Sequence, residues 1–125
     1  MAEQSKKILH VDDEIDIIYI VEFVLSNGGF EVVRLDDSTL AIEELKKTDY
    51  SLLILDLMMP KLDGFALLEK LRREASLQKL PVMILSSRQL TKDETDFCKN
   101  MKAFVMSKPF EPHRLLEKVR EILTE

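Results

Sequence analysis

Cysteine and long apolar runs are scarce in this chain of 125 residues. Its single cysteine, Cys98, excludes an intramolecular disulfide and fits the reducing cytosol. No apolar run approaches the roughly 18 residues that a membrane-spanning helix requires. A polar leader of about residues 1–6 lacks the apolar core of a secretory signal. We therefore expect a soluble, cytoplasmic protein that does not associate with membranes.

An excess of positive charge is also missing. The chain has 18 Lys and Arg against 23 Asp and Glu, a formal net charge of -5, and its basic residues are scattered among acids. Because no basic face is evident, direct nucleic acid binding is not expected. Repeats, linkers and low-complexity tracts are absent from the sequence too. We expect a single domain over residues 1–125, long enough to bury a hydrophobic core.

Short apolar runs alternate with amphipathic segments along the chain. Strands are predicted at about residues 8–11, 30–35, 51–56, 82–85 and 103–106. Helices are predicted at about residues 14–27, 38–47, 65–73, 90–102 and 111–123. This alternation predicts an α/β fold, a doubly wound parallel sheet of five strands in the order 2-1-3-4-5 with helices on both faces.

The third of these strands is the most informative. Residues 52–55 are apolar at every position, which predicts a strand buried on both faces. Asp56 follows directly, ahead of Pro60 and the turn pair Asp63-Gly64. Taken alone, an aspartate at a strand end would simply start a turn, so its meaning depends on what the other strand ends carry.

Polar side chains end four of the five predicted strands. Asp12 and Asp13 follow the first strand, Asp56 the third, Ser86 the fourth and Lys108 the fifth. In a parallel sheet these ends meet at one edge. Three crowded carboxylates repel one another unless a cation joins them, and hard oxygen ligands suit Mg²⁺. A lysine and a serine facing such an ion suit a phosphoryl group, which Asp56 could attack as a nucleophile.

Four blocks of this sequence resemble the receiver domain of two-component response regulators. They are Val11-Asp12-Asp13-Glu14, Leu55-Asp56-Leu57-Met58-Met59-Pro60 with Asp63-Gly64, Pro81-Val82-Met83-Ile84-Leu85-Ser86-Ser87, and Lys108-Pro109-Phe110. The resemblance covers nearly the whole chain and implies a CheY-like, flavodoxin-like (βα)5 fold. It also implies a signalling module that is not an enzyme, apart from its own phosphorylation and autodephosphorylation.

The resemblance implies a role for each acid of the cluster. Asp56 would accept a phosphoryl group from the phosphohistidine of a sensor histidine kinase or phosphotransfer domain. Asp13, Asp56 and the backbone carbonyl of Met58 would hold Mg²⁺, with Asp12 acting largely through water.

The remaining site residues and the output also follow from the resemblance. Ser86 and Lys108 would contact the phosphoryl oxygens, and the peptide bond between Lys108 and Pro109 would be cis. Phosphorylation would switch the surface of the fourth helix, fifth strand and fifth helix. No output domain is visible, so we expect either a stand-alone receiver with a downstream protein partner or a homodimer, or a domain of a longer regulator.

One position departs from the family pattern. Receivers usually carry a tyrosine or phenylalanine three residues before the lysine, where this chain has Val105, and the aromatic residue here is Phe104. Side chains alternate along a strand, so Phe104 faces the other side unless a bulge shifts the register. Two alternatives stay open: a bulge restores an aromatic switch, or the switch position is a small valine. We favour valine.

The first predicted helix carries an extra apolar stripe. Its core-facing positions are satisfied by Ile17, Ile18, Ile20, Val21, Val24 and Leu25. Ile15, Tyr19 and Phe23 then follow at four-residue spacing on the other side. Single apolar surface residues are normal, but three in line predict an exposed patch of the kind that marks a partner site. We expect a kinase, a phosphotransfer domain or a second copy of the chain to dock there.

Two other functions fit parts of the pattern less well. A haloacid dehalogenase-like phosphatase also uses a strand-end aspartate, but normally has a second aspartate two residues later, where this chain has Met58. A flavodoxin-like cofactor binder needs a Gly- or Ser/Thr-rich phosphate loop after the first strand, where this chain has three acids. His10 and His113 lack metal-ligand companions and are not expected to be functional.

Overall fold

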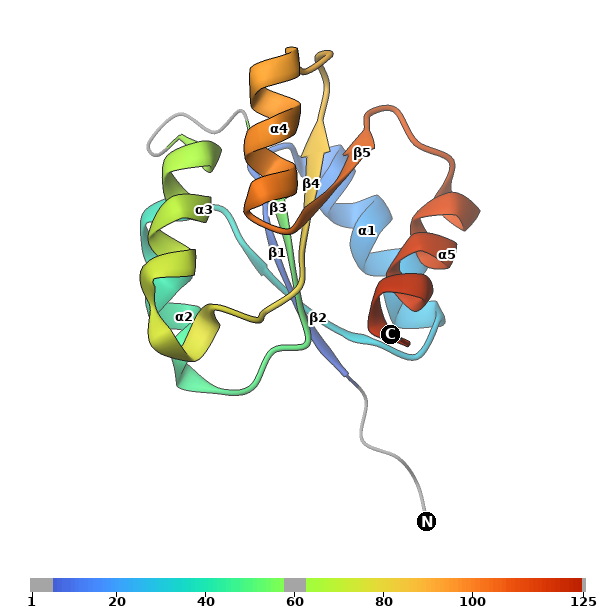
Figure 1. The fold of residues 1–125 in the computed structure, drawn as a ribbon. Helices are drawn as coiled ribbons and strands as arrows, with labels where there is room; N and C mark the ends of the chain where they lie inside the picture. Colours follow the sequence, from blue (N-terminus) through green and yellow to red (C-terminus); the bar gives the residue numbers. More distant parts are fainter. Residues whose placement is uncertain (1–5, 58–62, 125) are drawn as a thin grey trace.

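Five parallel strands form one sheet in the order β2-β1-β3-β4-β5 (Figure 1). The computed structural model describes residues 6–57 and 63–124. The strands are β1 (Lys7–Val11), β2 (Glu31–Leu35), β3 (Leu52–Asp56), β4 (Val82–Ser86) and β5 (Ala103–Ser107). The predicted strand order is confirmed, and every predicted strand is present within one residue at each end.

Helices cover both faces of the sheet, with α1 and α5 on one side and α2, α3 and α4 on the other (Figure 1). Their bounds are α1 (Ile15–Asn27), α2 (Ala41–Lys47), α3 (Gly64–Arg73), α4 (Lys92–Asn100) and α5 (Pro112–Leu123), with short 3-10 turns η1 (Ser38–Leu40) and η2 (Ala75–Leu77). Among the described helices, none combines the length and apolar character needed to cross a bilayer.

Local caps explain where two helices begin. The segment predicted as one helix at 38–47 opens as η1, where the Leu40 amide donates to the Asp37 carbonyl at 3.1 Å and the Asp37 carboxylate accepts from the Thr39 amide at 3.0 Å. The prediction of 90–102 for the fourth helix was two residues too long at each end. A capping box fixes its start: the Thr91 hydroxyl accepts from the Glu94 amide, and the Glu94 carboxylate accepts from the Thr91 amide.

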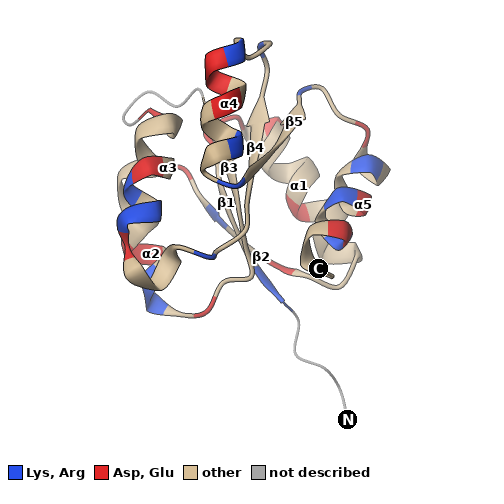
Figure 2. Ribbon diagram, in the orientation of Figure 1, with Lys and Arg blue, Asp and Glu red and all other residues tan. Residues whose placement is uncertain are grey.

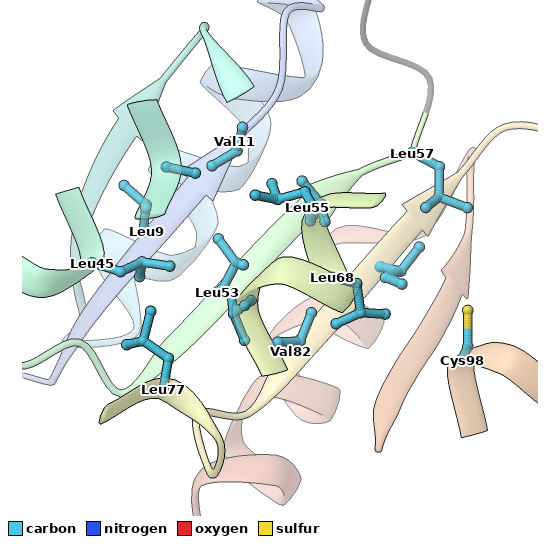
Figure 3. Close-up of a cluster of buried hydrophobic side chains, with 14 residues drawn as sticks. Leu9, Val11, Leu45, Leu53, Leu55, Leu57, Leu68, Leu77, Val82 and Cys98 are labelled. Carbon is cyan, nitrogen blue, oxygen red and sulfur yellow. The ribbon is translucent and has the colours of Figure 1, made fainter. Parts of the chain in front are cut away.

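The core consists of two apolar layers separated by the sheet. β3 is buried along its whole length, which confirms the prediction for that strand. Leu53 and Leu55 point into the layer shared with α2, α3 and α4, where they meet Leu68 (Figure 3). Cys98 of α4 is buried in the same layer. Each fully buried leucine contributes about 1.5–3 kcal/mol, so the two layers hold the strand ends firmly in place.

The register of β5 separates its aromatic residue from the expected switch position. β4 and β5 pair without interruption from Val82–Ala103 to Ser86–Ser107, so no bulge shifts either of these described strands. Phe104 therefore packs in the layer with α1 and α5, under Lys118. Val105 faces the opposite side and is 39% exposed. This register removes the bulge on which the aromatic alternative depends, and a switch role for Val105 stays a prediction.

α1 buries a narrower stripe than the sequence suggested. Ile18, Val21 and Leu25 are buried. Ile20, which was expected in the core, is 40% exposed, and this prediction was wrong. The helix turns by about 100° per residue, so Ile20 lies about 160° around the helix from Ile18 and about 100° from Val21, outside the buried stripe.

Candidate functional site

The carboxyl ends of β1, β3, β4 and β5 lie together at one edge of the sheet, the upper end in Figure 1. Asp12 and Asp13 leave β1 there, and Asp56 and Ser86 are the last residues of β3 and β4. Lys108 follows β5. The structure therefore brings together the five strand-end residues predicted from the sequence.

The three aspartates form a group that a metal ion could occupy. Each of Asp12, Asp13 and Asp56 offers a carboxylate oxygen, and these oxygens lie within 4.8 Å of one another. Asp12 and Asp56 are buried while Asp13 is exposed, so the group opens to solvent on one side. All-oxygen donors with room for water are what Mg²⁺ prefers, so the residues present fit such an ion. The predicted ligand at Met58 lies outside the described residues.

Lys108 supplies the positive charge of the site. Its Nζ lies 2.7 Å from Glu14 Oε1, 3.5 Å from Asp12 Oδ2 and 3.6 Å from Asp56 Oδ1. Burial disfavours the charged form, but the hydrogen bond to Glu14 and the nearby aspartates outweigh it and raise the pKa of Lys108. The bond between Lys108 and Pro109 is cis, as predicted. Glu14 was not predicted as a site residue, because its contact with Lys108 depends on how the two side chains turn once the chain has folded.

Asp12 is held through both of its carboxylate oxygens. Oδ1 accepts from the Glu14 amide at 3.0 Å, and Oδ2 lies 3.2 Å from His10 Nε2. Burial raises the pKa of Asp12, but the hydrogen bonds from His10 and Glu14 and the charge of Lys108 lower it below its usual value. His10 is fully buried beside Asp12. Its place two residues before Asp12 put it on the same face of the strand, which was a signal available in the sequence.

Ser86 is engaged with its own loop. Its Oγ donates to the Arg88 carbonyl at 2.7 Å, and the Arg88 amide donates back to Oγ at 3.3 Å. The Arg88 guanidinium in turn forms a two-pronged contact with the Glu94 carboxylate, both bonds being 2.7 Å long. A chain of hydrogen bonds therefore runs from the end of β4 to the first turn of α4.

The predicted partner surface is exposed. Ile15, Tyr19 and Phe23 are 61%, 55% and 69% exposed along α1. A hollow of about 330 Å³ lies between Ile15, Tyr19 and the end of β2. Elsewhere on the described helices, charges of both signs are interspersed, so no face is uniformly basic (Figure 2).

Known proteins with similar sequences include a response regulator and several transcriptional regulators. The chain is 37% identical over 124 residues to the response regulator Rre1 of Synechocystis, covering 98% of this chain and 53% of that protein. It is 30% identical over 119 residues to the alkaline phosphatase synthesis transcriptional regulatory protein PhoP of Bacillus subtilis, covering 95% of this chain and 49% of that protein. The chain thus spans about half the length of the curated relatives it matches.

Similarity to solved structures and to a family model points the same way. The crystallised chemotaxis protein CheY4 of Vibrio cholerae has a TM-score of 0.87 and 28% identity, covering 95% of this chain and 99% of that one. The family model described as the response regulator receiver domain matches residues 8–120. Because that match takes in almost all of the sheet and its helices, the chain belongs to the receiver domains of two-component response regulators, and its architecture is CheY-like.

Proposed function

We propose that this receiver is a phosphoacceptor, and that Asp56 takes a phosphoryl group from the phosphohistidine of a sensor histidine kinase or phosphotransfer domain. One observation carries the proposal: buried Asp56 shares an acidic cluster with Asp12 and Asp13, and Lys108 Nζ stands 3.6 Å from its carboxylate. The protein would act as a signalling module, and the only other reaction we propose for it is hydrolysis of its own phosphoryl group.

Asp56 would react as the nucleophile. One of its oxygens forms the new P–O bond while the P–N bond to the donor imidazole breaks, and that nitrogen keeps the electron pair. Lys108, already charged and aimed at Asp56, would then neutralise a phosphoryl oxygen. Ser86, at the end of the neighbouring strand, would donate its hydroxyl proton to another.

The acidic cluster supports a divalent ion, Mg²⁺ being the best fit to all-oxygen donors. When bound, the ion would supply positive charge that offsets the charge of the transferring group. Asp13 and Asp56 would hold it together with the carbonyl of Met58, and Asp12 would act largely through water.

We infer that Ser86 couples phosphorylation of Asp56 to the conformation of the loop between β4 and α4. A hydroxyl has one proton, so a bond from Oγ to a phosphoryl oxygen replaces the bond from Oγ to the Arg88 carbonyl. Arg88 is fixed to Glu94 of α4, so this exchange would shift the loop and the first turn of that helix. We infer a change at the surface of α4, β5 and α5, with Val105 in place of an aromatic switch residue.

The exposed apolar stripe on α1 supports a proposal for the partners of this protein. We infer that Ile15, Tyr19 and Phe23 anchor the kinase or phosphotransfer domain. This exposed stripe begins directly after Asp12-Asp13-Glu14, so a protein bound to it would lie beside the acidic cluster. Output would pass to a downstream protein or a second copy of the chain. Direct nucleic acid binding is not proposed, since positive charge is interspersed with negative charge on the described helices (Figure 2). We place the protein in the cytoplasm, where sensor kinases present their phosphohistidine.

Acetyl phosphate with Mg²⁺, followed by intact mass measurement, tests the proposal. The wild type is expected to gain one phosphoryl group, while Asp56→Asn gains none and chelation of the metal suppresses the gain. Asp49→Asn, which changes an exposed aspartate outside the acidic cluster, is the matched control and is expected to match the wild type. Sustained phosphate release over many turnovers, with no adduct on Asp56, would instead indicate a phosphatase.

A further inference from the structure

A buried histidine lies directly beneath the acidic cluster. His10 is in β1 and is fully buried, on the face of the sheet that packs against α1 and α5. In the sheet register it stands between Arg34 of β2 and Ile54 of β3. The next residue of β1 on that face, Ile8, is apolar and fully buried. An imidazole in such surroundings loses its hydration, so its presence requires a compensating interaction.

That interaction is with Asp12. His10 Nε2 lies 3.2 Å from Asp12 Oδ2, while Nδ1 has no hydrogen-bond partner among the described residues. A carboxylate can only accept, so Nε2 must carry the proton of this bond. Leaving a lone pair on Nδ1 unpaired is less costly than leaving a buried N–H unpaired, which is consistent with the proton on Nε2.

The bond to His10 completes the restraint on the Asp12 carboxylate. The Glu14 amide holds Oδ1 at 3.0 Å, so His10 fixes the second oxygen and with it the plane of the group. Lys108 is a weaker restraint on Oδ2, because its Nζ is 3.5 Å away and lies closer to Glu14. Without His10, we expect Oδ2 to turn toward Lys108 and away from its place in the cluster.

We propose that His10 is a positioning residue: its Nε2–H donates to Asp12 Oδ2 and fixes that carboxylate within the acidic cluster. The proposal rests on the function proposed above, in which the cluster binds a divalent ion. His10 touches neither the ion nor the phosphoryl group and acts only through Asp12. Hydrogen-bonding partners of carboxylates at metal sites typically change metal affinity by about 10- to 100-fold when removed.

The first test uses the wild type without metal. Long-range ¹H–¹⁵N NMR of the imidazole is expected to show a proton on Nε2 of His10. An Nε2 without a proton could not donate to Asp12 and would overturn the proposal. This measurement needs neither Mg²⁺ nor a phosphodonor, so it stands whatever happens to the proposed phosphoacceptor function.

The second test compares substitutions. His10→Leu removes the donor from an apolar site, and His10→Gln restores an N–H near the position of Nε2. His113→Leu is the matched control, because His113 is exposed on α5. Mg²⁺ dissociation constants come from amide shifts in titrations with Mg²⁺ alone. The Mg²⁺ concentration that half-saturates phosphorylation by acetyl phosphate is a second readout.

We expect His10→Leu to weaken Mg²⁺ binding by about tenfold or more, His10→Gln to lie closer to the wild type, and His113→Leu to match it. The inference fails if His10→Leu binds Mg²⁺ as the wild type does, or if His10→Gln is as weak as His10→Leu, which would indicate packing rather than a hydrogen bond.

If His10→Leu does not fold, His10→Asn replaces it. Its shorter amide cannot reach Asp12 as Gln does, and equal affinity of the two amide variants would overturn the proposal. Failure of the wild type to bind Mg²⁺ would overturn the metal part of the proposed function, while the imidazole spectrum would still report on the bond to Asp12.

Discussion

Lys108 is the residue that offsets the negative charge of the buried aspartates in the site. Asp12 and Asp56 are both buried, and each lies within 4 Å of the Lys108 ammonium. The Lys108 side chain is itself only 5% exposed, so solvent screens these charges weakly. The same lysine that would neutralise a phosphoryl oxygen therefore stabilises the resting fold.

Replacing this lysine should destabilise the metal-free protein. Lys108→Met leaves two buried aspartates without their cation, and breaking a buried pair in this way costs about 3 kcal/mol. Urea unfolding at neutral pH with chelator present measures the loss. Lys70→Met, at an exposed lysine of α3, is the control and should change little. Equal stability of Lys108→Met and the wild type would mean that the acids do not depend on Lys108.

The residue scale also marks the limit of prediction from the sequence. Asp12, Asp13, Asp56, Ser86 and Lys108 could be placed together because the ends of parallel strands share one edge. The contact from Lys108 to Glu14 could not, since it depends on how two side chains turn after the chain has folded. The bond between His10 and Asp12 was within reach, as the two share a strand face, but its importance rests on burial that only the packed helices create.

At the scale of elements, the loop between β4 and α4 is tied to both of its neighbours. Ser86 holds the backbone of Arg88, and the side chain of Arg88 holds Glu94 in the first turn of α4. Glu94 is also the capping-box partner of Thr91. The Thr91-x-x-Glu94 pattern was present in the sequence and would have placed the helix start correctly. The register of β5, by contrast, could not be settled from alternation alone, because a bulge leaves no unambiguous sequence signal.

The ion pair at the start of α4 predicts a pH-dependent contribution to stability. The hydrogen bond from Arg88 is the largest cause that lowers the pKa of Glu94, from 4.5 to about 2. A lowered pKa means that the stabilisation is present above the unfolded value of 4.5 and is lost as the pH falls toward about 2. Glu94→Gln keeps an acceptor for Thr91 but removes this charge.

Thermal unfolding across this pH range measures the effect. The wild type is expected to melt higher than Glu94→Gln at pH 6, and the gap should close as the pH falls from about 4.5 to about 2. Glu117→Gln on α5 serves as the matched control, with no such pH-dependent gap. A gap between wild type and Glu94→Gln that persists unchanged at pH 2 would mean that the charge of Glu94 is not its source.

At the scale of the whole molecule, the two faces of the sheet have different surroundings. The layer under α2, α3 and α4 is closed by apolar side chains. On the other side α1 buries one stripe and exposes another, in which Ile15 and Tyr19 line the hollow beside β2. The exposed stripe was predicted from four-residue spacing, whereas the exposure of Ile20 was not. The sequence does not show how much of the α1 surface packs against α5. The extent of that packing decides which apolar residues of α1 remain exposed to solvent.

This exposed stripe predicts a separation between two phosphodonors. The double substitution Tyr19→Glu with Phe23→Glu places charge where a protein donor would bury aromatic rings, and aromatic anchors of that kind each contribute about 2 kcal/mol to binding. Phosphotransfer from a sensor kinase that is active on the wild type should fall at least about tenfold. Phosphorylation by acetyl phosphate should stay unchanged, because this small donor needs only the acidic cluster and Lys108. Leu40→Glu, at another exposed apolar residue, is the control and should affect neither reaction. Equal loss with both donors would mean that the stripe supports the site itself rather than a partner. If the wild type self-associates in sedimentation and the double variant does not, the stripe is instead the interface of a homodimer.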